Sequence, residues 1–355
     1  MAGKGVNAGD ILFARRGAAG VITLNRPQAL NAVTHEMVRA LHAQLEAWAR
    51  EDAITRVIIA AAGERAFSAG GDIRHLYELG KSGRREEALQ FWRDEYPLNA
   101  FIKNYPKPYV ALIDGIVMGG GVGVSVHGSH RIAGDRFSFA MPEVGIGFFP
   151  DVGATYFLPR MPGRLGRYCA LTGERFNAAD AIVAGIATHR VVSARFPALL
   201  EALSGTAAVE EVLAGFAEPL GEGPILARRS AIDRLFTGGS VEDILAALGR
   251  EASSSSAESG WAAKIATTIR AKSPLSLKIA LAQVRRGGDM DFAACMRTEF
   301  RIVSRIIEGH DFYEGVRAVI VDKDNKPRWR PAALEQVGDA DVERHFAPLT
   351  RELAL

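Results

Sequence analysis

Hydrophobic positions in the first part of the chain predict several β-strands. Short apolar runs at residues 11–13 and 21–24 predict two strands, joined by a hairpin-like turn at 15–17. Continuous apolar runs at 56–62 and 109–113 are typical of strands buried on both faces of a parallel sheet. The pattern therefore predicts a sheet whose later strands run parallel to one another.

Other hydrophobic positions recur with the period of an α-helix. Thr34 can cap one such helix, and residues 74–104 carry a second helical pattern. Strands that alternate with helices favour right-handed βαβ crossovers and an α/β core. The later part of the chain is rich in Ala, Leu, Glu and Arg at helical spacing, with a surface turn at 253–256. We therefore expect a core over residues 1–192 and a mainly helical region over residues 193–355 that packs on it.

Composition restricts the class of protein and its partners. The chain has 355 residues, of which 48% are hydrophobic and 24% charged, and its formal net charge is +2. These values are typical of a globular protein and point neither to nucleic acid nor to a membrane. Cys169 and Cys295 form no CxxC motif, which suits a reduced compartment. Residues 1–10 lack the features of a signal or transit peptide, so we expect a cytoplasmic protein.

Two glycine-rich turns each follow a predicted strand. The first is Ala66-Phe67-Ser68-Ala69-Gly70-Gly71-Asp72, and the second is Met118-Gly119-Gly120-Gly121-Val122-Gly123. A strand that runs into a glycine turn and then into a helix directs backbone N–H groups into a common space. Two such groups can form an oxyanion hole, whereas close packing of a helix on a strand is the structural alternative.

Other chemistries fit these positions less well. Neither turn completes the GxGxxG of a dinucleotide site, and Gly80-Lys81-Ser82 lacks the leading glycine of a P-loop. No GxSxG motif surrounds Ser68 or Ser125, which argues against a serine hydrolase. His127 and His130 have no carboxylate or cysteine at ligand spacing. We therefore expect no metal.

Residues 141–153 place two carboxylates, Glu143 and Asp151, in an otherwise apolar segment that glycine and proline interrupt. An ionised carboxylate is unfavourable there unless it is paired or takes up a proton. Two acids in such a loop are typical of acid–base or nucleophilic chemistry. The alternative is that Asp151 caps a helix and Glu143 is solvated.

Several motifs together resemble the enoyl-CoA hydratase/isomerase (crotonase) superfamily. They occur in the order and spacing of that family: Asn25-Arg26-Pro27, Leu30-Asn31-Ala32 and the two glycine turns. Further segments are most similar to the branch that hydrolyses short 3-hydroxyacyl-CoA thioesters: 91–96, 119–129, 140–153, 171–173 with 185–189, and 310–324. The resemblance covers roughly residues 11–330 and fades between about 193 and 265.

The resemblance implies an α/β fold, a right-handed spiral of ββα units with a C-terminal helical layer. It implies an acyl-CoA thioester as substrate and no cofactor besides its coenzyme A. The N–H groups of Gly71 and Gly120 would form the oxyanion hole for the thioester oxygen. Glu143 and Asp151 would be catalytic, and Glu95 would bind substrate together with Gly120, Glu143 and Asp151. Glu143 would be either the nucleophile or the general base, and the sequence leaves both open.

Other implied features concern the coenzyme and the assembly. Four residues would line the CoA channel: Ala69, Gly71, Asp72 and Ile73. A homo-oligomer is also implied, because the superfamily often forms trimers and pairs of trimers, although the sequence leaves the oligomeric state open.

One departure from the family pattern concerns the reaction. Hydratases of this superfamily carry a first catalytic glutamate where this chain has Gly123, and generally a small residue where it has Asp151. The resemblance therefore implies hydrolysis of 3-hydroxyisobutyryl-CoA, or of a similar short 3-hydroxyacyl-CoA, as a step of valine breakdown. The alternatives are an enoyl-CoA hydratase/isomerase and a non-catalytic acyl-CoA- or RNA-binding protein of the same fold. The small net charge argues against RNA, and three acids at site positions argue against an inactive enzyme.

Overall fold

The computed structural model describes residues 9–355 and divides the chain into two compact units. Unit 1 consists of Met1–Asp72, Pro97–Phe139 and Arg175–Leu226, and unit 2 consists of Ile73–Tyr96, Ala140–Glu174 and Ala227–Leu355. The boundary expected after residue 192 falls inside the last segment of unit 1 and stays a prediction. Most of the segment from which we predicted a cytoplasmic location, residues 1–8, lies outside the described residues.

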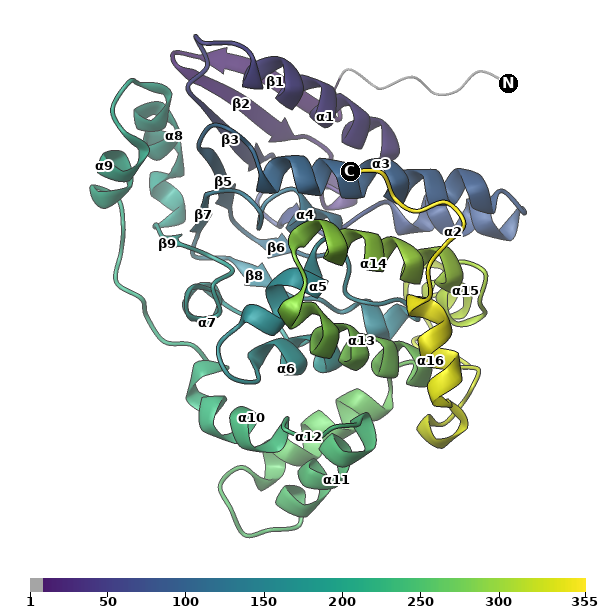
Figure 1. Ribbon diagram of the computed structural model, residues 1–355. Coiled ribbons are helices and arrows are strands. Elements are labelled where there is room, and N and C mark those ends of the chain that lie inside the picture. The colour runs from purple at the N-terminus through teal and green to yellow at the C-terminus, as the bar shows by residue number, and fades with distance from the viewer. Residues whose placement is uncertain (1–8) are drawn as a thin grey trace. The chain divides into compact units, whose positions relative to one another are not determined.

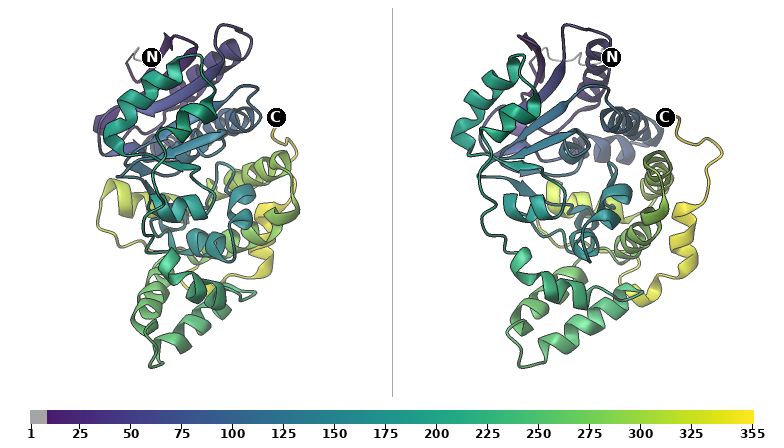
Figure 2. Two further views of the ribbon diagram at one scale, coloured as in Figure 1. Left: turned by 90° about the vertical axis from the view of Figure 1, so that its left-hand side faces the viewer. Right: turned by 60° about the vertical axis from the view of Figure 1, so that its left-hand side comes forward.

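Unit 1 contains every strand of residues 9–355, which confirms an α/β class for this part of the chain. A six-stranded sheet has the order β1-β2-β3-β5-β7-β9, and Figures 1 and 2 show its strands side by side. Only the pair β1–β2 is antiparallel, as predicted for a hairpin followed by parallel strands. The strands are β1 (Ile11–Arg16), β2 (Ala19–Leu24), β3 (Arg56–Ala61), β5 (Tyr109–Ile113), β7 (His130–Ala133) and β9 (His189–Arg190).

A second sheet carries the glycine turns. It has three parallel strands in the order β4-β6-β8: Ala66–Ser68, Ile116–Val117 and Ser138–Phe139. The sequence placed the turns directly after the strands at 56–62 and 109–113, and this was wrong in detail. Because β4 and β6 are only three and two residues long, they have no periodicity that a sequence pattern could reveal.

Helices cover both faces of the large sheet in unit 1. Side chains alternate across a strand, and Val21 of β2 joins Leu199 and Leu213 in an apolar cluster on one face. Its neighbour Gly20 faces the other way, where an added Cβ would lie 2.5 Å from the ring of Trp48. The unit 1 helices are α1 (His35–Ala49), α4 (Gly120–Gly123), α7 (Ala178–Val183), α8 (Phe196–Ser204) and α9 (Val209–Ala214).

The first helix shows how local sequence sets these elements. The Thr34 hydroxyl accepts a hydrogen bond from the N–H of Met37 at 3.2 Å, as predicted for a helix cap. The apolar positions that recur along α1 are all buried: Met37, Val38, Leu41, Leu45 and Trp48.

The described residues of unit 2 form helices and connecting loops, without a β-strand. The predicted helices at 74–104 are α2 (Ile73–Lys81) and α3 (Arg85–Lys103), and α3 continues across Pro97 into unit 1. The others are α5 (Ala154–Phe157), α6 (Leu165–Thr172), α10 (Arg229–Leu235), α11 (Val241–Ala252), α12 (Ser259–Arg270), α13 (Pro274–Arg286), α14 (Phe292–Ile306), α15 (Asp311–Val316) and α16 (Asp339–Phe346). The predicted surface turn at 253–256 is exposed and joins α11 to α12.

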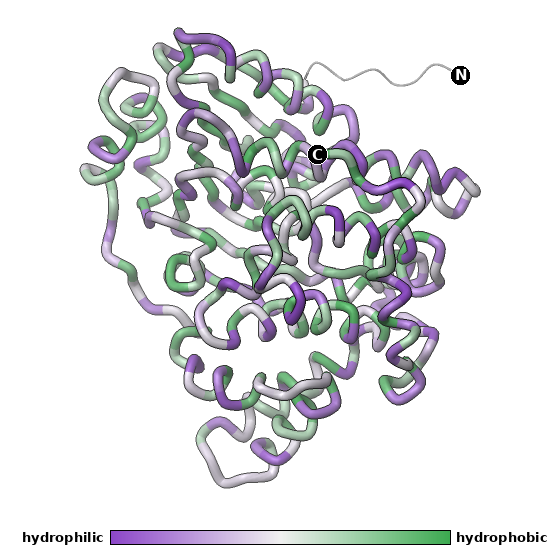
Figure 3. The backbone as a smooth tube through the Cα atoms, viewed as in Figure 1, coloured by the Kyte–Doolittle hydropathy of each residue, from purple (hydrophilic) through white to green (hydrophobic). Residues whose placement is uncertain are grey.

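Hydropathy changes within each turn of these helices, as Figure 3 shows along α13 and α14. This pattern is expected of helices that bury one face and expose the other. No helix among residues 9–355 has both the length and the apolar content that a membrane crossing requires.

Candidate active site

In the first glycine turn, the N–H of Gly71 points away from Val33, the residue with which Gly71 pairs. Gly71 pairs with Val33 in a parallel bridge. The bridge uses the carbonyl of Gly70 and the N–H of Asp72, which bond to Val33 at 2.9 and 3.0 Å. In a parallel bridge the N–H of the paired residue itself points the opposite way. Within residues 9–355 the Gly71 amide therefore donates to no protein acceptor.

The second glycine turn supplies another such amide beside the first. Gly120 is the first residue of α4, so its N–H has no partner within the helix. The turns are joined by a hydrogen bond from Met118 N to Ser68 O at 3.0 Å, and a Cβ on Gly70 would lie 3.8 Å from Gly120 N. Among the described residues, unit 1 thus presents two amides on adjacent turns for which no protein acceptor is found, as an oxyanion hole requires.

Unit 2 contains a cluster of buried carboxyl groups. The predicted residues Glu95, Glu143 and Asp151 are joined by Glu299, and their exposed fractions are 1%, 6%, 4% and 0%. In the described part of the chain none of these groups forms an ion pair with Lys, Arg or His. Burial raises the pKa of each of them, and for Glu95, Glu143 and Glu299 the charge of a neighbouring acid adds to the shift. The raised pKa values favour the neutral, protonated form of these carboxyl groups.

Asp151 lies in a strained turn before α5. Val152 has a φ of 52° and Gly153 a φ of 93°, and a β-branched residue such as Val152 rarely adopts a positive φ. The Tyr96 hydroxyl donates to Asp151 Oδ2 at 3.0 Å, and the Trp92 side chain also donates to this carboxylate. Burial raises the pKa of Asp151 to about 7, although both hydrogen bonds oppose the shift. The alternative role as a helix cap is wrong, because the cap of α5 is Gly153.

Glu143 begins a 3₁₀ turn, Glu143–Ile146, and is buried, so the alternative of a solvated side chain is also wrong. Burial and the charge of Asp151 raise its pKa well above the usual value. Its Oε2 has no hydrogen-bond partner in the described residues. The same segment contributes Phe148, which stacks on Trp92 at 5.6 Å between ring centroids. Because Trp92 also donates to Asp151, this stacked pair lies next to that acid.

Glu95 and Asn99 lie one helical turn apart on α3. Oε1 of Glu95 and both amide atoms of Asn99 have no hydrogen-bond partner in the described part of the chain, and both side chains are almost fully buried. Burial and the charges of Asp151 and Glu299 raise the pKa of Glu95 well above its ordinary value. Buried polar atoms without partners are rare in proteins and are expected where a ligand or water binds.

Sequence reasoning missed Glu299 and Asn99. Glu299 lies on α14 one turn from Cys295 and one turn from Val303, both buried. An acid at this spacing on an apolar helix face was the signal that could have revealed it. Asn99 follows Glu95 by four residues, and that spacing alone carries no comparable signal.

Three of the residues expected along the CoA channel, Ala69, Gly71 and Asp72, lie in unit 1, whereas Ile73 begins α2 of unit 2. The Asp72 carboxylate lies 3.4 Å from the guanidinium of Arg26, and its N–H donates to Val33. Their contact with coenzyme A stays a prediction.

Ser125 and His130, which were considered for other kinds of site, form contacts with neighbouring protein groups. The Ser125 hydroxyl donates to the Gly121 carbonyl at 2.6 Å, so it serves the helix. His130 lies 3.3 Å from the Glu210 carboxylate. Among residues 9–355 no cluster of His, Cys, Asp and Glu could hold a metal ion.

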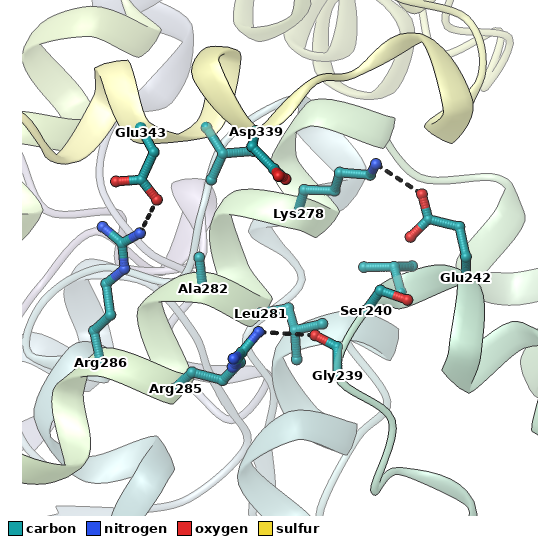
Figure 4. A pocket seen from close by; sticks show the side chains of 12 residues that line it. Gly239, Ser240, Glu242, Lys278, Leu281, Ala282, Arg285, Arg286, Asp339 and Glu343 are labelled. Atoms are coloured by element: carbon teal, nitrogen blue, oxygen red, sulfur yellow. Dashed lines mark hydrogen bonds and ion pairs between the residues drawn. The ribbon is translucent and has the colours of Figure 1, made fainter.

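A pocket of about 420 Å³ in unit 2 contains none of the predicted residues (Figure 4). Lys278 lies 2.7 Å from Glu242, and Arg286 pairs with Glu343. Arg285 donates to the Gly239 carbonyl at 2.9 Å. Two of the three cations are therefore paired with acids, and the third donates to a backbone carbonyl.

Comparison with known sequences adds the family to this geometry. Residues 19–346 match the enoyl-CoA hydratase/isomerase family. The chain is 45% identical over 357 residues to a protein of Danio rerio named 3-hydroxyisobutyryl-CoA hydrolase, mitochondrial, covering 98% of this chain and 92% of that one. The protein of the same name from Homo sapiens is 42% identical over 96% of this chain and 89% of its own length.

Solved structures of similar fold carry different names. One is described as a carnitinyl-CoA dehydratase from Mycobacterium thermoresistibile, with a TM-score of 0.91, 44% identity and coverage of 97% of this chain and 98% of that chain. Another is described as an enoyl-CoA hydratase from Rhodobacter sphaeroides, with a TM-score of 0.90, 39% identity and coverage of 98% and 100%. All of these names describe proteins that act on acyl-CoA thioesters.

Proposed function

Because the chain belongs to the enoyl-CoA hydratase/isomerase family, we propose that it hydrolyses 3-hydroxyisobutyryl-CoA, or a similar short 3-hydroxyacyl-CoA, to the free acid and coenzyme A. The observation that carries this proposal is the buried pair Glu143 and Asp151, which forms no ion pair with a Lys, Arg or His side chain among residues 9–355. The names of its curated relatives support the same reaction.

In the proposed reaction Glu143 supplies the chemistry at the thioester carbonyl. Either its carboxylate attacks the carbon and forms an anhydride that water then cleaves, or it removes a proton from the attacking water. The C–S bond breaks, a C–O bond forms, and the thiolate of coenzyme A leaves and takes up a proton. The amides of Gly71 and Gly120 stabilise the oxyanion, and this assignment rests on the family motif and on their unpaired N–H groups.

Asp151 and Glu95 recognise the acyl group in this proposal. An ionised Asp151 accepts the hydrogen bond of the 3-hydroxyl, and it assists departure of the thiol by holding the acyl group in place. Glu95 has an unpartnered Oε1 for the same group. A substrate without the hydroxyl would leave Glu95 Oε1 without a partner and Asp151 with one hydrogen bond fewer, which typically lowers kcat/KM by a large factor.

The alternative is an enoyl-CoA hydratase or isomerase, the activity named for one of the similar structures. Gly123 argues against it, because glycine has no side chain to position water or to protonate carbon. Incubation with crotonyl-CoA separates the two reactions. Loss of the conjugated absorbance without release of a free thiol would establish hydration and contradict the hydrolase.

The direct test is thiol release from 3-hydroxyisobutyryl-CoA, 3-hydroxypropionyl-CoA and their 3-deoxy analogues. We expect hydrolysis of the hydroxylated thioesters at least ~10-fold faster, by kcat/KM, than of the deoxy analogues. Equal rates for both sets would contradict the roles of Asp151 and Glu95. Relative rates for the two hydroxylated compounds would identify the acyl group.

The proposal also includes features that depend on the cell. These are a step in valine breakdown, a cytoplasmic location, a homo-oligomer and no cofactor besides the coenzyme A of the substrate. The relatives are named as mitochondrial proteins, so fractionation of source cells is the test of location. Light scattering of the purified chain measures the oligomeric state.

A further inference from the structure

We propose that Glu299 is a positioning residue for Asp151, and that it acts by fixing the strained turn in which Asp151 lies. This inference rests on the proposed function, because Asp151 is assigned there to the 3-hydroxyl of the substrate. Nothing in the sequence motifs points to Glu299, and the inference comes from its contacts within unit 2.

Glu299 binds the turn through both of its carboxyl oxygens. Oε2 accepts the N–H of Gly153 at 2.8 Å, and Oε1 accepts the N–H of Thr155 at 2.8 Å. The two donors follow Asp151 by two and four residues. A carboxylate held by two backbone amides fixes the direction of the chain between them, and here that chain includes Val152 at a φ of 52°. A strained conformation of this kind persists only when its surroundings determine it.

A second side chain fixes the other side of the same turn. Nε2 of Gln283, on α13, donates to the Pro150 carbonyl at 2.5 Å and to Oγ1 of Thr155 at 2.7 Å. The Thr155 hydroxyl in turn bonds to Glu299. Gln283, Thr155 and Glu299 are all fully buried, so the turn has protein contacts on both sides of Asp151.

Glu299 could simply cap the first turn of α5. The length of this helix and the burial of the carboxyl group indicate that capping is not its only role. The helix has only four residues. The carboxyl group is completely buried, and Asp151 and Glu95 repel its charge. Burial, with the charge of Asp151, raises the pKa of Glu299 to about 8 despite its two backbone hydrogen bonds. Glu299 differs from an ordinary helix cap because its two oxygens bind the amides two and four residues after Asp151, so it fixes the turn that carries this acid.

The test is a double-mutant cycle of Glu299→Gln and Asp151→Asn, followed by thiol release from 3-hydroxyisobutyryl-CoA and from isobutyryl-CoA. In Glu299→Gln an amide N–H₂ replaces one oxygen and faces a backbone N–H, so one of the two contacts is lost. We expect the preference for the hydroxylated thioester, as a ratio of kcat/KM, to fall about 10-fold or more. In the Asp151→Asn background the same change should alter the preference by less than about 2-fold, because the effect passes through Asp151.

Two outcomes would overturn the inference. One is an equal loss of kcat/KM for both thioesters in Glu299→Gln, which is the result of a purely structural role. The other is additivity in the double-mutant cycle, in which Glu299→Gln lowers the preference by the same factor with Asp151 and with Asn at position 151. Wild-type enzyme that releases no thiol from any 3-hydroxyacyl-CoA would instead contradict the proposed function, so the two failures are distinguishable.

Two further variants keep the test decisive. Glu251→Gln is the matched control, because Glu251 pairs with Arg234 at 2.7 Å on the helices α10 and α11 and has no contact with the turn. It should keep both activities. Thr155→Val replaces Glu299→Gln in the same measurement if the latter does not fold. The valine variant removes only the hydroxyl that bonds to Gln283 and Glu299. We expect it to lower the preference about 2–5-fold, and an unchanged preference would overturn the inference.

Discussion

The two units provide polar groups in opposite ways. Unit 1 presents the N–H groups of Gly71 and Gly120, which carry no net charge and are placed by strand pairing and by the start of α4. Unit 2 presents side-chain carboxyl groups that are buried without a cation. Unpaired backbone amides require only a particular chain path, whereas buried acids lower stability and change their pKa. We therefore expect the role of the unit 1 amides to depend on backbone geometry, and the role of the unit 2 acids to depend on their protonation.

The largest effect is expected from the acid that carries the chemistry. Glu143→Gln preserves size and polarity but removes the nucleophile or base, so we expect kcat for thiol release to fall about 10³-fold or more. Because the group is buried and uncharged in the variant, the thermal midpoint should not fall. Unchanged release of coenzyme A would contradict the assignment of Glu143.

A smaller loss is expected from the glycine turns. Gly120→Pro removes one N–H at the first position of a helix, where proline is tolerated. The loss of one oxyanion donor should lower kcat about 100-fold or more, with a smaller change in KM. Gly120→Ala keeps the N–H and is the matched variant. If both variants lose activity equally, crowding at the turn rather than the amide explains the effect.

The pH dependence distinguishes the two units further. Asp151 acts as an ionised acceptor in the proposal, and its pKa of about 7 predicts that thiol release falls as the pH drops below about 7. The Tyr96 hydrogen bond lowers this pKa, so Tyr96→Phe should move the acid limb of the kcat/KM profile to higher pH. Gly120→Ala, which leaves the acids intact, should keep the wild-type limb. An unshifted limb in Tyr96→Phe would contradict the role of that hydrogen bond.

The smallest effect concerns stability. The folded pKa values of Asp151 and Glu299, about 7 and about 8, lie above their ordinary values of 3.8 and 4.5. A raised carboxyl pKa contributes stability at low pH that is lost as the pH rises through the folded value. The thermal midpoint should therefore decrease between about pH 5 and pH 8, and Glu299→Gln should reduce the slope by an amount on the order of a few degrees.

The control is Glu251, whose contribution to stability changes with pH in the opposite direction. Hydrogen bonds from Arg234 and Ser256 lower the pKa of Glu251, so its contribution is lost as the pH falls. Glu251→Gln should leave the alkaline slope unchanged. A wild-type midpoint that rises steadily from pH 5 to pH 8 would contradict the protonated state of the cluster.

The sequence by itself determined much of unit 1. Continuous apolar runs give β3 and β5, because a strand buried on both faces has no polar positions. Thr34 begins α1, because its hydroxyl satisfies a free N–H of the first turn. The motifs at Gly71, Gly120, Glu143 and Asp151 also identified the family, since each depends on residue type and local spacing.

Only the tertiary structure decided how the acids act on one another. The sequence separates Asp151 from Glu299 by more than a hundred positions, and no local pattern reports that α14 meets the turn before α5. The short strands β4 and β6 were likewise invisible, because their pairing depends on residues distant in sequence. Local periodicity determines which faces of an element are buried, whereas long-range packing determines which buried groups share a proton.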